Sequence, residues 1–183
     1  MRVIGGSAKG QRLTSLPGEN TRPTMDRVKE SMFNMIQMHL YDAAVLDLFA
    51  GSGGLGIESL SRGAKECCFV DEHRESMQVI KENLAKTKLS SYSTTLLTDF
   101  SRALESLHRE GKSFDLIFLD PPYGKGLVEE ALTIIVKEKL LAPEGLIIIE
   151  QDKKESLEIQ EDHYSLWKEK KYGNTMVRIL KQQ

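Results

Sequence analysis

The sequence has few cysteines and no long hydrophobic run. Its two cysteines, Cys67 and Cys68, are adjacent, which excludes a disulfide framework and gives no spacing suited to a metal site. No apolar run approaches the length of a membrane span, and the opening residues MRVIGGSAKG lack the hydrophobic core of a signal peptide. We therefore expect a cytoplasmic protein that binds no metal and contacts no membrane.

The length and composition indicate one globular domain. With 183 residues, 40% of them hydrophobic and 28% charged, the chain can bury a single core and is too short for two. We expect one domain over residues 1–183, with an N-terminal extension over 1–40 and the main body over 41–183. Gly5, Gly6 and Gly10 lie among basic residues, which favours a short strand or hairpin at the start of the extension.

Charge is distributed unevenly along the chain. Residues 1–30 carry six Lys and Arg against three Asp and Glu, a local charge of +3. Because the net charge of the whole chain is −2, residues 31–183 carry a charge of −5. Such a basic segment can face a polyanion, and solvated surface charge is an equally good interpretation.

A helix is predicted to begin near Thr24, which can cap it, with Asp26 in the first turn near the positive end of the helix dipole. Arg27 and Lys29 lie off the apolar face of this helix. Residues at helical spacing form that face: Val28, Met32, Met35 and Ile36.

From Ala44 onward, apolar strands alternate with amphipathic helices. The pattern predicts strands at Val45–Phe49, Glu66–Val70, Thr94–Leu97, Phe114–Leu119 and Gly145–Glu150. Helices are predicted at Leu55–Arg62, His73–Lys86, Ser101–Glu110 and Leu127–Leu140. A C-terminal antiparallel hairpin follows, formed by Leu166–Lys171 and Thr175–Leu180. We therefore expect an α/β fold: a Rossmann-like, doubly wound and mainly parallel sheet of seven strands.

The loop after the first strand is rich in glycine. In DLFAGSGGLG, Asp47 to Gly56, the glycines allow a tight turn and close approach to a ligand, and Asp71 lies 20 residues past Gly51, where an acid can reach ribose hydroxyls. A nicotinamide dinucleotide would fit this spacing, but Asp47 would oppose its pyrophosphate. An acid suits a cationic ligand, and S-adenosylmethionine carries a sulfonium, an ammonium and a ribose. The predicted cofactor-binding residues here are Asp47, Phe49, Ala50, Gly51, Ser52, Gly53, Asp71 and Glu72.

A stiff elbow, Asp120-Pro121-Pro122-Tyr123, follows the fourth predicted strand. Two consecutive prolines remove two N–H groups and force extended geometry on the residues before them, so neither a helix nor a ladder can continue. Asp120 and the Pro121 carbonyl could accept the two N–H bonds of an amino group, while Tyr123 could stack on a base. A helix-capping turn is the plain structural alternative.

Three further residues are weaker candidates. Asp99 and Phe100, after the third strand, could contact the adenine of the cofactor, although an N-cap followed by a core residue explains them almost equally well. Lys125 could touch a phosphate, and a solvated surface position is the simpler explanation.

The whole chain resembles the class I, Rossmann-like methyltransferases that use S-adenosylmethionine. The elbow is similar to their [Asp/Asn/Ser]-Pro-Pro-[Tyr/Phe] motif, which marks methylation of an exocyclic or amide nitrogen. The segment RPTMDRVKESMFN, Arg22 to Asn34, is similar to the signature of the bacterial enzymes that methylate N2 of one guanine in 16S ribosomal RNA, the RsmD type. This resemblance implies catalytic roles for the elbow and 16S rRNA or the small ribosomal subunit as partner, and we expect a monomer. The positive charge of the N-terminal segment predicts RNA contacts for Arg22 and Arg27, with Lys125 as a further candidate.

Two alternatives remain open from the sequence. The same elbow would serve methylation of DNA adenine or of a protein glutamine, and the basic N-terminal segment is what favours RNA. The second alternative is a non-catalytic RNA-binding scaffold with this fold. It is disfavoured because the chain keeps Asp47, Gly51, Gly53, Asp71 and Asp120.

Overall fold

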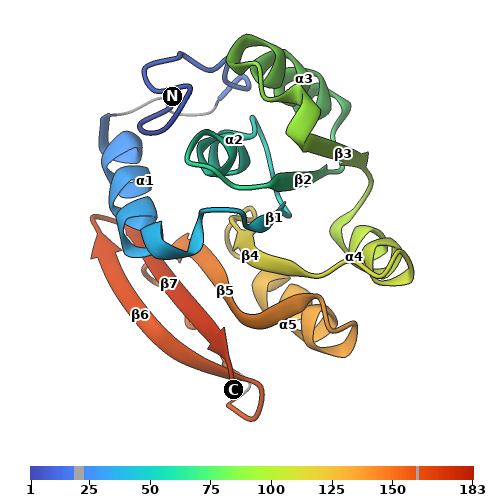
Figure 1. The fold of residues 1–183 in the computed structure, drawn as a ribbon. Coiled ribbons are helices and arrows are strands. Elements are labelled where there is room, and N and C mark those ends of the chain that lie inside the picture. The colour runs from blue at the N-terminus through green and yellow to red at the C-terminus, as the bar shows by residue number, and fades with distance from the viewer. Residues whose placement is uncertain (19–22, 160) are drawn as a thin grey trace.

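A seven-stranded sheet in the order β3-β2-β1-β4-β5-β7-β6 runs through the protein (Figure 1). The computed structural model describes residues 1–18, 23–159 and 161–183. The first five strands of that order are parallel, and β7 is antiparallel to both β5 and β6. The strands are β1 (Ala44–Asp47), β2 (Glu66–Asp71), β3 (Ser93–Leu97), β4 (Phe114–Leu119), β5 (Leu141–Asp152), β6 (Tyr164–Tyr172) and β7 (Thr175–Gln182). The predicted fold class, including the C-terminal hairpin, is confirmed.

Helices cover both faces of the sheet (Figure 1). Helices α1, α2 and α3 pack on one face, and α4 and α5 pack on the other. Alternate strand residues serve the two sides: Phe118 of β4 packs toward the first group, and Leu119 toward the second. The helices are α1 (Pro23–Met35), α2 (Gly54–Ser61), α3 (Arg74–Thr87), α4 (Phe100–Arg109) and α5 (Leu127–Lys137), with short 3₁₀ turns at Gln37–His39 and Ser90–Tyr92.

Most element boundaries lie close to the predicted ones, and one helix is clearly shorter. β4 has the predicted bounds, whereas α5 ends at Lys137 instead of Leu140. Lys139 adopts a positive φ of 52°, which ends the helical path and turns the chain into β5. β5 consequently begins at Leu141, four residues before the predicted start.

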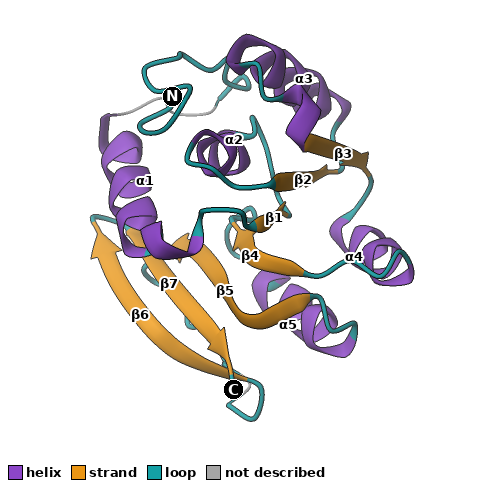
Figure 2. Ribbon diagram, in the orientation of Figure 1, coloured by secondary structure: helices purple, strands orange, loops and turns teal. Residues whose placement is uncertain are grey.

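The N-terminal extension makes a hairpin-like reversal, one of the two forms predicted for it, and differs from its prediction in two respects. Residues 1–18 contain no strand, and an isolated antiparallel bridge between Arg2 and Arg12 holds their hairpin-like reversal (Figure 2). α1 begins at Pro23, whose fixed φ suits the first helical position, so Thr24 lies inside the helix and is not its cap. Lys29, predicted to lie off the core face, is only 5% exposed.

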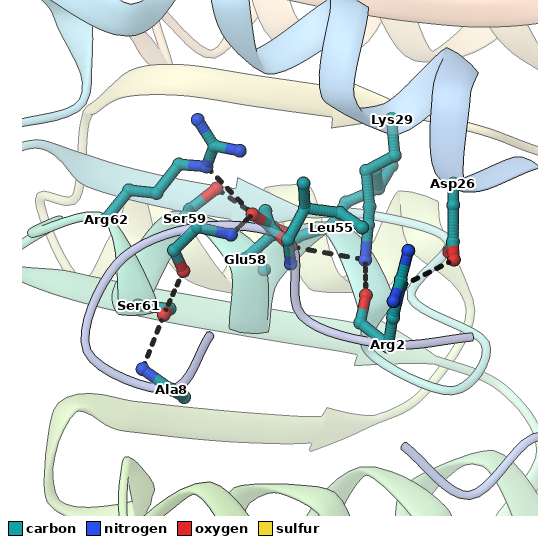
Figure 3. Close-up of polar contacts among 12 residues, drawn as sticks. Arg2, Ala8, Asp26, Lys29, Leu55, Glu58, Ser59, Ser61 and Arg62 are labelled. Atoms are coloured by element: carbon teal, nitrogen blue, oxygen red, sulfur yellow. Dashed lines mark hydrogen bonds and ion pairs between the residues drawn. The ribbon is translucent and has the colours of Figure 1, made fainter. Parts of the chain in front are cut away.

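A buried cluster explains why Lys29 is enclosed (Figure 3). Glu58 of α2 is fully buried, and its carboxylate lies 3.2 Å from the Lys29 ammonium and 2.8 Å from Nε of Arg62. It also accepts the backbone N–H groups of Ile4 and Gly5, each at 2.8 Å. Lys29 in turn donates to the Arg2 carbonyl at 2.6 Å. The cluster therefore fastens the N-terminal segment and α1 onto α2.

Candidate active site

A cavity of about 620 Å³ opens at the carboxyl ends of β1, β2, β3 and β4. This is where ligands bind in doubly wound sheets. The cavity is lined by every residue predicted to bind cofactor or act in catalysis except Gly53, and also by Lys125. Arg27 lies elsewhere, beside a second cavity between α1 and the N-terminal segment. Arg22 lies outside the described residues.

Asp47 ends β1 with its side chain buried. Its Oδ2 accepts the backbone N–H of Gly56 at 2.9 Å, which satisfies one of the amides left unpaired in the first turn of α2. Burial raises the pKa of Asp47 to about 7 even though this hydrogen bond opposes the shift, and the charge of Asp71 adds to it. A cationic ligand in the cavity would favour the ionised carboxylate.

Asp71, at the end of β2, holds the glycine-rich loop in place. Its Oδ2 accepts the N–H of Gly51 at 2.9 Å, and its Oδ1 accepts the N–H of His73 at the same distance. Gly51 and Gly53 have φ of 53° and 82°, a region that favours glycine, so the turn depends on them. Oδ1 also lies 3.1 Å from the ring Nδ1 of His73, so Oδ2 is the oxygen with the greater capacity to accept a further hydrogen bond from a ligand.

The loop after β3 supplies a cap and an aromatic wall. Asp99 is the N-cap of α4, accepting the Arg102 N–H at 3.1 Å and the Ser101 hydroxyl, and these hydrogen bonds lower its pKa. The Phe100 ring lies 5.3 Å from the Phe49 ring in a tilted pair. Asp99 therefore has the structural role considered for it, and it also lines the cavity with both rings. The aromatic pair offers a flat apolar surface to a planar ligand.

The proline elbow lines the cavity from the end of β4, the strand next to β1. Pro121 is buried, while Pro122 and Tyr123 are exposed, and Tyr123 is 48% accessible. Burial raises the pKa of the Tyr123 hydroxyl to about 12, and the nearby carboxylates of Asp120 and Glu150 contribute. Gly124 donates its N–H to Glu155, which ties the loop to the segment after β5. A half-exposed ring on a rigid loop is placed to stack on a planar group entering from solvent.

Several residues that form this site were not predicted from the sequence. Glu150 and Thr175, at the adjoining ends of β5 and β7, line the cavity beside Tyr123, and Lys29 lines it from α1. Asn83 of α3 is fully buried and donates to the Ser52 carbonyl at 2.9 Å, supporting the glycine-rich loop from behind. Glu150 was recognisable as the first acid after an apolar strand, the same signal that identified Asp71.

Over residues 1–18, 23–159 and 161–183, no group of three or more His, Cys, Asp or Glu side chains is arranged to hold a metal ion. Within the same ranges, no helix combines the length and hydropathy needed to cross a membrane.

Comparison with known proteins gives matches over nearly the whole chain. The family described as "Conserved hypothetical protein 95" matches residues 1–181. The "Putative rRNA methyltransferase YlbH" of Bacillus subtilis is 42% identical over 181 residues, covering 99% of this chain and 98% of that protein. "Ribosomal RNA small subunit methyltransferase D" of Escherichia coli is 34% identical over 183 residues, covering 100% of this chain and 90% of the relative.

A solved structure agrees with this assignment. The structure described as "Putative methyltransferase yhhF from Escherichia coli" superposes with a TM-score of 0.88 at 33% identity, covering 100% of this chain and 98% of the other. The match thus extends to the N-terminal segment, the glycine-rich loop, the elbow and the hairpin, and the resemblance predicted from the sequence is confirmed. The chain belongs to the conserved hypothetical protein 95 family, together with ribosomal RNA small subunit methyltransferase D.

Proposed function

We propose that this protein transfers a methyl group from S-adenosylmethionine to the exocyclic N2 of a guanine in 16S ribosomal RNA. The observation that carries the proposal is that the glycine-rich loop, Asp47, Asp71 and the Asp120-Pro121-Pro122-Tyr123 elbow all line one cavity. The relatives named as small-subunit rRNA methyltransferases support the substrate class. The proposed place of action is the small ribosomal subunit or its assembly intermediate.

The cavity residues at the carboxyl ends of β1, β2 and β3 fit the cofactor. The buried Asp47 suits a ligand with positive charge, the Asp71 carboxylate lines the cavity as an acceptor for a ribose hydroxyl, and the Phe49–Phe100 pair suits an adenine ring. When bound, the cofactor supplies an electrophilic methyl group on its sulfonium. The backbone at Gly51 can approach the ligand closely because this residue carries no side chain.

The elbow fits an amino group on a base. The lone pair of such a nitrogen is delocalised into the ring, so the amino group is a weak nucleophile. Asp120 and the Pro121 carbonyl would each accept one of its N–H bonds and orient its lone pair toward the methyl group. Tyr123 would stack on the base once the base has flipped out of the RNA helix. N2 loses one proton as it gains the methyl group, and Asp120, which would accept that N–H, would take the proton.

The experiment compares wild type with Asp120→Ala in methylation of small subunits from a strain that lacks the gene. We expect N2-methylguanosine by nucleoside mass spectrometry with wild type, and a single-turnover rate about 10²–10³ lower with the variant. Calorimetric titration with S-adenosylhomocysteine should give similar affinities, because Asp120 acts on the acceptor.

Other outcomes would overturn particular parts of the proposal. A near-normal rate for Asp120→Ala would remove the elbow from catalysis. Methylation of DNA adenine or of a protein glutamine, with none of ribosomal RNA, would replace the acceptor while keeping the cofactor. Saturable binding of NAD in place of S-adenosylhomocysteine would exclude a methyltransferase.

A further inference from the structure

Glu150 lies next to the proline elbow on the neighbouring strand. Leu119 of β4 pairs with Ile149 of β5, so Asp120 and Glu150 follow at adjacent positions at the carboxyl ends of two parallel strands. Phe118 and Ile148, two residues earlier in each strand, both pack on the α1 side of the sheet, and side chains two apart share a face. From these strand ends, Asp120 and Glu150 line the same cavity as Tyr123 and Thr175.

The carboxylate of Glu150 differs from those of three other acids that line the cavity. Asp47, Asp71 and Asp99 each accept at least one backbone N–H. For Glu150, the part of the chain that the structure describes provides no side-chain hydrogen bond and no ion pair. Burial raises the pKa of this carboxyl to about 7. Because a partly buried carboxylate without a donor is unfavourable, this position is suited to a ligand that brings its own N–H.

We propose that Glu150 is a specificity-determining residue that accepts the N1–H of the guanine whose N2 is held by the elbow. This inference rests on the proposed function. Guanine presents N1–H directly beside its N2 amino group, so an acceptor next to Asp120 meets this proton. Adenine has no proton on N1, and its amino group lies at a different carbon. A carboxylate at this place therefore selects guanine over adenine, as base-flipping enzymes select through the Watson–Crick edge.

A general base is the alternative role for the same carboxylate. A base would take a proton from N2 after or during transfer, and its loss would slow methylation of every acceptor that carries an N2 amino group. An N1–H acceptor, in contrast, discriminates between bases that share this amino group. The base 2-aminopurine separates the two roles, because it carries the N2 amino group and has an unprotonated N1.

The test uses small subunits reconstituted with 16S RNA carrying either guanine or 2-aminopurine at the methylated position, which is mapped first with wild type. Single-turnover rates are measured for wild type, Glu150→Gln and Glu150→Ala. Glu144→Gln, which changes an exposed acid of the same strand, is the matched control. Calorimetry with S-adenosylhomocysteine verifies that each variant is folded.

We expect wild type and the control to methylate guanine at least about tenfold faster than 2-aminopurine, the effect of about one charged hydrogen bond. In Glu150→Gln this ratio should fall by about tenfold, because an amide can also donate to an unprotonated N1. In Glu150→Ala the ratio should approach one. A variant that slows both acceptors equally and keeps the wild-type ratio would overturn the inference in favour of a general base.

Failure of the proposed function would look different. If wild type forms no N2-methylguanosine in guanine-containing subunits, the acceptor assignment fails, and the role of Glu150 fails with it. If wild type methylates guanine and all variants keep its preference, the proposed function stands and the role assigned to Glu150 is wrong.

Discussion

Two glutamates removed from bulk water, Glu58 on α2 and Glu150 at the end of β5, have opposite surroundings. Glu58 is surrounded by donors: two backbone N–H groups, an ammonium and a guanidinium, all within 3.2 Å. Within the described ranges, Glu150 makes no side-chain hydrogen bond and no ion pair, and it faces the cavity. The first acid stabilises the fold, whereas the second is costly to the protein alone and available to a ligand.

The comparison separates structural from functional acids without reference to any relative. Burial of an ionised carboxylate must be offset by donors, and the folded chain supplies them at Glu58 and Asp71. Where the chain supplies no donor, the simplest physical reason for an acid at that position is a ligand that supplies one. Removing the two kinds of acid should therefore change stability in opposite directions.

The largest effect is expected for Glu58→Ala. The substitution leaves the Lys29 ammonium buried without its carboxylate and leaves the amides of Ile4 and Gly5 without acceptors. We expect the free energy of unfolding, measured by urea denaturation, to fall by about 3–5 kcal/mol. Glu66→Ala is the control, since Glu66 lies 3.8 Å from Lys112 and both side chains are nearly half exposed, and it should cost about 1 kcal/mol or less. Equal losses in the two variants would contradict the structural role of the cluster.

Glu150→Gln should instead stabilise the ligand-free protein. The folded pKa of Glu150 is raised from 4.5 to about 7, so its contribution to stability is fully present below pH 4.5 and is lost as pH rises through about 7. The glutamine side chain does not ionise, so the variant does not lose stability in this way. Above pH 7 its free energy of unfolding should exceed that of wild type by about 1–3 kcal/mol, and the difference should vanish near pH 4. Denaturation at several pH values measures it. In both wild type and variant, the free energy of unfolding should still fall somewhat as the pH rises through about 7, because the pKa of Asp47 is also raised to about 7. A variant less stable than wild type at pH 8 would show that Glu150 is a structural acid after all.

Asp71→Ala tests an acid that has both properties. Asp71 holds the Gly51 and His73 amides and also lines the cavity, so its loss should loosen the loop and remove ligand contacts together. We expect the affinity for S-adenosylhomocysteine to fall about ten- to a hundredfold by calorimetry, since each hydrogen bond to a charged group contributes about 1.5–3 kcal/mol. Glu75→Ala, an exposed acid in the first turn of α3, should leave affinity unchanged. Unchanged affinity for Asp71→Ala would exclude it from the cofactor site.

The sequence predicted the elements that have a local signal. The glycine-rich loop, Asp71 and the proline elbow all follow apolar strands directly, and parallel topology brings such loops to one edge of the sheet. One misplaced residue, Lys29, and one site residue that was not predicted, Glu150, depend on partners distant in the sequence. Lys29 was assigned to the exterior because the apolar face of α1 was taken as too narrow, and the Glu58 that neutralises it lies on another helix. Glu150 stood in a predicted strand, but only its register with Leu119 and Asp120 shows that it faces the elbow.

The smallest effect is expected at Arg27, the exposed arginine of α1 beside the second cavity, where Arg2 and Lys9 add positive charge and Asp26 and Glu30 oppose it. If this edge faces ribosomal RNA, Arg27→Ala should lower the slope of log affinity against log salt by nearly one, because each phosphate contact releases about one counterion.

The control for Arg27 is Arg109→Ala, an exposed arginine on α4 across the sheet, which should leave the salt slope unchanged. Both variants should retain wild-type thermal midpoints and S-adenosylhomocysteine affinity, since neither side chain is buried or lines the main cavity. Binding to small subunits at several salt concentrations measures the slope. If both variants keep the wild-type slope, Arg27 is a solvated surface charge, and the basic N-terminal segment no longer supports RNA over a protein or DNA acceptor.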